Sequence, residues 1–140
     1  MVESLIFWAG VGQLVLVIGS LAIPKVLSWS EDTAKLRPLT RQVFWTYAGY
    51  IWATNLSFAI ISIASPSCLL DKTFLSTAVS LYITLYWLAR VVIQFTYFDR
   101  SDAPSGAFFT AAEVFLVGLF VSLVWIYGYA VFLNFSAPVA

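Results

Sequence analysis

The sequence has no histidine, one cysteine and few charged residues, and each scarcity excludes a class of function. Without histidine, there is no imidazole for haem or metal ligation or for acid–base catalysis. The single cysteine, Cys68, excludes an intramolecular disulfide and a CxxC redox pair. We therefore predict no catalytic residue, no metal site and no cofactor, and the sequence gives no positive reason to expect an enzyme.

Charge is scarce and balanced. Charged residues make up 10% of the chain, whereas about 25% is usual in a soluble domain. Seven basic and seven acidic residues give a net charge of zero, so no nucleic-acid partner is expected. Hydrophobic residues make up 61%. The composition predicts an all-α integral membrane protein whose main partner is the lipid bilayer.

Four apolar stretches are long enough to cross a hydrocarbon core of about 30 Å, which takes about 20 helical residues. Their predicted limits are 5–23, 43–64, 74–98 and 107–133. Prolines at 24, 66 and 104 mark the intervening breaks. Residues 1–140 are thus expected to form a single domain, an antiparallel bundle of four transmembrane helices. The alternative of a cleaved signal peptide at the first stretch lacks the usual preceding basic residue.

Basic residues predict the orientation of the bundle. The two connections expected on one side carry five lysines and arginines, and the other side carries Lys72 alone. The five are Lys25, Lys35, Arg37, Arg41 and Arg100. By the positive-inside rule these connections lie in the cytoplasm and both termini outside. A prokaryotic inner membrane is the simplest setting.

The connection between the first two spans has room for a short surface helix. Ser28 and Glu31 fit a capping box, which predicts a helix ending near Leu36. This helix and the residues after it would then lie at the membrane surface, facing the headgroups with the indole of Trp29 and three cations. The three cations are Lys35, Arg37 and Arg41. A solvated linker is the competing interpretation.

Arg90 and Glu113 are full charges inside the predicted spans. Arg90 lies eight residues before Phe98, or about 12 Å from the end of its span, and Glu113 lies about 9 Å into the next. Because an isolated charge at such a depth costs about 2.5–3.5 kcal/mol, we predict an ion pair between them. In the alternative, Arg90 snorkels to the surface and Glu113 is protonated. A pair would either lock the two helices together or line a transport pathway.

Other polar residues recur at helical spacing. Tyr82, Tyr86, Arg90 and Gln94 form one stripe of the third span, expected to face the bundle interior or a partner protein. Asn55 and Gln13, at comparable depth on the second and first spans, are predicted to hydrogen-bond to each other. A wet cavity lined by Gln13, Asn55, Tyr86 and Arg90 is the alternative.

Aromatic and small residues suggest further contacts. Trp52 and Trp87 fall near mid-membrane, where they would pack against helices or wall a site for a lipophilic ligand. Gly49 with Ala53, and Gly118 with Ser122, form pairs four residues apart that permit close helix approach. Their sequence positions alone do not say which helix approaches.

Two classes of function fit these features. The first is a non-catalytic accessory subunit or homo-oligomer, bound to other membrane subunits or to itself. The second is a small transporter or a protein that binds a lipophilic ligand, with Glu113 and Arg90 as its working charges. A membrane enzyme using Tyr86 or Glu113 as acid or base remains a third alternative.

Overall fold

The computed structural model describes residues 1–136, which are almost entirely helical and contain no strand. The elements in chain order are α1 (Val2–Ser20), α2 (Ile23–Val26), α3 (Trp29–Ala34), α4 (Pro38–Ala64), the 3-10 helix η1 (Pro66–Leu70), α5 (Phe74–Thr96) and α6 (Ala107–Phe135). Helix α1 together with α2, and each of α4, α5 and α6, is long and apolar enough to cross a membrane. The predicted membrane class and its four spans are confirmed at this level.

Local sequence explains most helix limits. Helix α5 starts where Thr73 and Ser76 each accept a hydrogen bond from the other's backbone N–H, a capping box. Helix α4 begins at Pro38, five residues before the predicted span. Proline suits a first helical turn because the N–H that it lacks would have no partner there. The polar residues before Val43 therefore extend the helix instead of forming a loop.

The predicted short helix after the first span is present as α3, but its expected capping box is absent. Ser28 adopts the left-handed conformation, with φ of 52°, and its side chain caps no N–H among the described residues. An N-cap normally has extended backbone angles. A different residue holds α3 instead: the hydroxyl of Thr33 donates to the Trp29 carbonyl at 2.6 Å and accepts from the Trp45 indole at 3.3 Å. Helix α3 is thereby fastened to α4.

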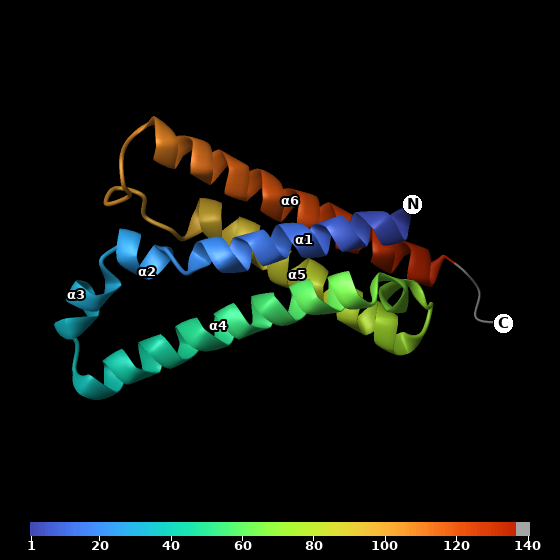
Figure 1. The fold of residues 1–140 in the computed structure, drawn as a ribbon, viewed down its shortest axis with the longest axis horizontal. Helices are drawn as coiled ribbons and strands as arrows, with labels where there is room; N and C mark the ends of the chain where they lie inside the picture. Colours follow the sequence, from blue (N-terminus) through green and yellow to red (C-terminus); the bar gives the residue numbers. More distant parts are fainter. Residues whose placement is uncertain (137–140) are drawn as a thin grey trace.

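The termini of the described chain and η1 gather at one end of the molecule, as Figure 1 shows. We call this the terminal end. Helices α2 and α3, the start of α4 and the connection from α5 to α6 lie at the opposite end (Figure 1). We call it the basic end, because these segments contain the five basic residues counted above.

The helices pack as two principal pairs, α1 with α4 and α5 with α6. Each presents one face to the core at helical spacing. The core residues are Ile6, Ala9, Gly10, Gln13 and Val17 of α1, Phe58, Ala59 and Ser62 of α4, Ser76, Ser80, Ile83 and Trp87 of α5, and Phe120, Leu123, Tyr127, Ala130 and Asn134 of α6. The buried residues of α4 all belong to its second half, near the terminal end.

Helix α4 diverges from the other helices toward the basic end (Figure 1). Phe58 is 5% exposed and contacts Tyr86 of α5, with ring centroids 5.1 Å apart. Ile51 and Tyr47 lie two and three turns earlier on the same face of α4, yet they are 55% and 63% exposed. The face that packs on α5 at Phe58 is therefore uncovered in its first half by any described residue.

Helices α1 and α4 approach each other closely at Gly10. A Cβ atom at this position would lie 2.8 Å from Cβ of Ser62 and 3.1 Å from the backbone nitrogen of Ile63. Such distances leave no room for a side chain, so the crossing of α1 and α4 requires glycine here.

We predict that Gly10→Ala lowers the free energy of unfolding by about 1–3 kcal/mol, because a methyl group would force the two backbones apart. Gly19→Ala is the matched control, since a Cβ there meets no atom within 4 Å among the described residues. The control should gain up to about 1 kcal/mol, the usual effect of replacing a helical glycine. Denaturant titration in detergent would measure both, and equal midpoints for the two variants would disprove the crowding.

Candidate functional site

One hydrogen-bond network at the centre of the bundle joins all four long helices. Gln13 of α1 is fully buried, and its amide nitrogen donates to the Tyr127 hydroxyl of α6 at 2.6 Å and to the Ala9 carbonyl at 3.3 Å. Its amide oxygen accepts from the Trp87 indole of α5 at 3.1 Å. The Tyr127 hydroxyl is also bonded to the Ser62 hydroxyl of α4. We call Gln13, Ser62, Trp87 and Tyr127 the central network.

The central network differs from the predicted contact between Gln13 and Asn55. Gln13 uses its amide on α5 and α6 instead, while the buried side-chain oxygen of Asn55 has no hydrogen-bond partner in residues 1–136. Ser62 and Tyr127 were not predicted from the sequence as members of this network. Helix α6 is apolar on every side, so its sequence does not reveal which of its tyrosines points inward.

The two predicted mid-membrane tryptophans have separate structural roles. Trp87 is buried and stacks on Phe120, with ring centroids 5.3 Å apart. Trp52 donates its indole N–H to the Val17 carbonyl of α1 at 3.1 Å. The indole N–H of each tryptophan thus has its hydrogen-bond acceptor on a neighbouring helix, α1. They line no common cavity among those the structure shows.

A second polar chain lies toward the basic end. The Arg90 guanidinium donates to the Gln94 side-chain oxygen at 2.9 Å, and the Gln94 amide donates to Glu113 Oε1 at 3.0 Å. The other oxygen of Glu113 forms an ion pair with Arg100. We call Arg90, Gln94, Glu113 and Arg100 the arginine relay.

The arginine relay corrects the predicted direct ion pair between Arg90 and Glu113. Within residues 1–136, the carboxylate of Glu113 pairs with Arg100, and Gln94 stands between it and Arg90. Gln94 is one helical turn nearer than Arg90 to the end of α5. It therefore lies at a depth closer to Glu113, and the following connection brings Arg100 to the same carboxylate.

The Arg90 guanidinium is held between aromatic rings. Its central carbon lies 5.0 Å from the ring centroid of Phe98 and 5.0 Å from that of Phe120. Both distances fall within the range of cation–π attraction. Arg90 thus rests on the core stack of Trp87 and Phe120, on the side that faces the basic end.

The predicted polar stripe of α5 lies at the edge of the core. Tyr82 is 58% exposed and Tyr86 half-buried, and both contact the Phe58 ring of α4. The stripe therefore faces the side where α4 diverges, and the fully buried face of α5 runs instead through Ile83 and Trp87.

The residues predicted at the membrane surface lie at the basic end. Trp29 is half-buried and packs against Phe44 and Trp45, with ring centroids 5.0 and 6.0 Å apart. The three cations, Lys35, Arg37 and Arg41, are exposed. The arrangement is suited to a surface helix anchored by an aromatic cluster.

A clamp at the terminal end was also missed. Asn134 of α6 donates to the Leu69 carbonyl at 2.8 Å and accepts from the Lys72 backbone N–H at 3.2 Å. The hydroxyl of Ser80 donates to the same carbonyl at 3.2 Å. These bonds fix η1 against α5 and α6, and Lys72 turns the chain in the left-handed conformation, with φ of 57°.

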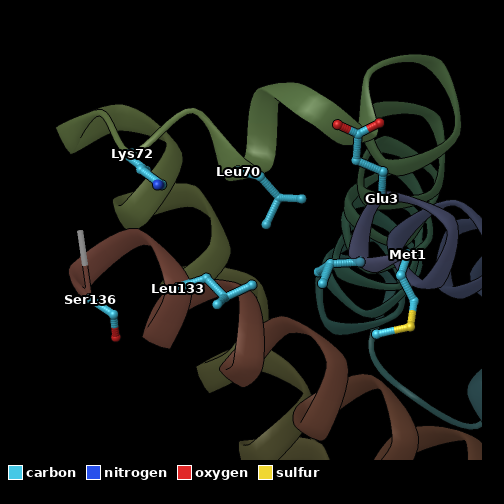
Figure 2. Close-up of a pocket in the computed structure, with 7 residues that line it drawn as sticks. Met1, Glu3, Leu70, Lys72, Leu133 and Ser136 are labelled. Carbon is cyan, nitrogen blue, oxygen red and sulfur yellow. The ribbon is translucent and has the colours of Figure 1, made fainter.

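The cavities lie away from the predicted site residues. One of about 490 Å³ opens at the terminal end, and Figure 2 shows Glu3 and Lys72 on opposite sides of it, with Leu70 between them. Another, of about 370 Å³, lies against α1 and α6 beside the exposed Trp125. Neither is lined by the central network or the arginine relay.

No protein-family model, curated protein or solved structure matches the chain.

We predict that Gln13→Leu and Tyr127→Phe each destabilise the protein by about 1–3 kcal/mol, because each leaves buried polar groups without a partner. The double variant should cost less than the sum, since both changes break the same bond. Ser122→Ala is a suitable control, because this exposed hydroxyl bonds only to its own helix at Gly118. Unfolding in mixed detergent would measure all four, and strictly additive losses would contradict the network.

Double-mutant cycles should also identify the partner of Glu113. Combining Glu113→Gln with Arg100→Gln is expected to give a coupling of about 0.2–1 kcal/mol that weakens with added salt. Combining it with Arg90→Gln should give a smaller coupling, since Gln94 separates the charges. A larger coupling to Arg90 would reinstate the direct ion pair.

Proposed function

We propose that the chain is a non-catalytic membrane protein that acts by association, either as an accessory subunit of a membrane assembly or as a homo-oligomer. The supporting observation is a face of small residues on α4 that no other helix within residues 1–136 covers. The proposal includes a single antiparallel four-helix domain, with both termini outside and the basic end in the cytoplasm of a prokaryotic inner membrane.

The uncovered face contains Gly49, Ala53 and Ser57, spaced four residues apart, and we call it the small-residue face. All three are exposed, and a Cβ at Gly49 would meet no described atom within 4 Å. Gly49 lies two and a half turns before Phe58, so this face points away from the core. Small residues at this spacing let a second membrane helix approach closely.

The contact between α1 and α4 is an example of small residues that allow two helices to pack closely. Gly10 and Ser62 bring α1 and α4 into close contact, where a Cβ on the glycine would clash. Gly49 and Ser57 offer the same combination on the opposite side of α4, without a helix against them. Gly118 and Ser122 form a smaller exposed pair on α6. A second copy or another membrane subunit would fit either surface.

The interior of the bundle favours association over the alternative of a transporter or lipophilic-ligand carrier. That alternative requires free polar groups along a pathway or cavity. Gln13 and Trp87, which it would use, are bonded to each other and packed. The partnerless oxygen of Asn55 is buried and Tyr82 is exposed, and neither residue lines the two cavities described above.

Cysteine cross-linking tests the small-residue face. In a Cys68→Ser background, Ala53→Cys should give a disulfide-linked dimer, or a link to another membrane polypeptide. Ile51→Cys should not, because it lies at nearly the same depth on the opposite side of α4. Gly49→Leu should abolish the assembly, since its side chain fills the space that a partner helix needs.

Native mass spectrometry of gently extracted wild-type protein supplies the second readout. Masses at multiples of the chain would support a homo-oligomer, and reproducible masses of other polypeptides would support an accessory subunit. A lone chain, together with equal cross-linking of Ala53→Cys and Ile51→Cys, would overturn the proposal.

A further inference from the structure

The arginine relay carries more positive charge than its own residues neutralise. It joins two guanidinium groups, Arg90 and Arg100, to one carboxylate, Glu113. Its formal charge is therefore 2 − 1 = +1. Among residues 1–136, Arg90 has no carboxylate within 4.0 Å and its side chain donates one hydrogen bond, to Gln94. A guanidinium has five N–H donors, so it retains capacity for another acceptor.

The neighbouring aspartates do not supply the missing charge. Asp99 accepts a hydrogen bond from the Ser101 backbone N–H at 2.9 Å within its own turn, which holds the pKa of Asp99 below its usual value. Neither Asp99 nor Asp102 forms an ion pair in the described part of the chain. Both carboxylates are exposed at the basic end.

The side chain of Arg90 extends toward the basic end of the molecule. Arg90 lies six residues before the end of α5 at Thr96, or about 9 Å along the helix. Its guanidinium extends toward that end, because it contacts the ring of Phe98, which lies beyond the helix. The charge is therefore placed near the boundary between hydrocarbon and headgroups, where lysines and arginines commonly meet lipid phosphates.

Arg90 is only partly buried, so a lipid can approach it from the surface of the bundle. Arg90 shares its stripe with Tyr82 and Tyr86, which contact Phe58 on the side where α4 diverges. Ile51 of α4 is uncovered there and offers apolar contact to an acyl chain. This side is distinct from the small-residue face, which points away from the core.

We propose that the arginine relay binds an anionic phospholipid of the leaflet at the basic end, with the lipid phosphate on the guanidinium groups of Arg90 and Arg100 and an acyl chain against the uncovered side of α4. Guanidinium recognises phosphate through paired hydrogen bonds, and the relay's charge of +1 complements a lipid whose headgroup carries no amine. The site does not depend on the proposed association through α4.

Lipid retention by the full chain tests this site. The protein would be purified in neutral detergent, mixed with equal amounts of phosphatidylglycerol and phosphatidylcholine, and examined by native mass spectrometry. We expect phosphatidylglycerol to be retained at least about fivefold more, and Arg90→Gln to reduce that retention about tenfold, as for loss of a charged hydrogen bond. Lys25→Gln is the matched control, because Lys25 is an exposed cation of the basic end that lies outside the relay and outside the residues predicted to face the headgroups.

Glu113→Gln provides an independent test in the opposite direction. It removes the only carboxylate of the relay, so the formal charge rises to +2 and Arg100 is released. Retention of phosphatidylglycerol should increase. This outcome does not depend on how well the Arg90→Gln protein folds.

Inorganic phosphate distinguishes a lipid site from a site for a free anion. Millimolar phosphate should leave lipid retention almost unchanged, because it lacks the acyl contacts. Equal retention of the two lipids, equal losses in Arg90→Gln and Lys25→Gln, or unchanged retention in Glu113→Gln would each overturn the proposal. Displacement of the lipid by phosphate would reassign the site to a free anion.

Discussion

The packing of this protein depends on the hydrogen bonds that the buried side-chain amide of Gln13 makes to other helices. In hydrocarbon there is no water to satisfy a buried amide, so its donors and acceptor must find partners on other helices. Gln13 finds them on Tyr127 and Trp87, and Tyr127 extends the network to Ser62. Because these bonds are directional, they fix the rotation of each helix about its axis, which apolar contacts alone leave loosely defined.

The number, order and approximate limits of the long helices were predictable because they depend on hydropathy and on local breaks. The starts at Phe74 and Ala107 and the end at Ala64 agree with the prediction. The start of α4 at Pro38 differs from the predicted start at Val43, because polar residues can continue a helix beyond the hydrocarbon as readily as they form a loop. Hydropathy measures what enters the membrane, and not where a helix begins.

The partners of the polar residues were less predictable, since they depend on helix rotation and on single side-chain lengths. Arg90 and Glu113 were expected at the same level of adjacent helices, but the contact of Glu113 falls one helical turn further along α5, on Gln94. The role of Gln13 as interhelical glue was anticipated, whereas Tyr127 was hidden in a helix that is apolar all round. Asn134 was also missed, because its partner is a backbone carbonyl, which every sequence position carries.

The position of Tyr127 and Asn134 on α6, after the other three long helices in the sequence, also sets an order of assembly during synthesis. Helices α1 and α4 enter the membrane with Gln13 and Ser62 while the tyrosine that bonds both has not yet been made. Ser62 and Tyr127 are 65 residues apart, which at ribosomal speeds corresponds to an interval of about 3–13 s. During that interval the nascent helices carry unsatisfied polar groups that an insertase or chaperone would have to shelter, and α6, which follows the other three long helices in the sequence, completes the central network.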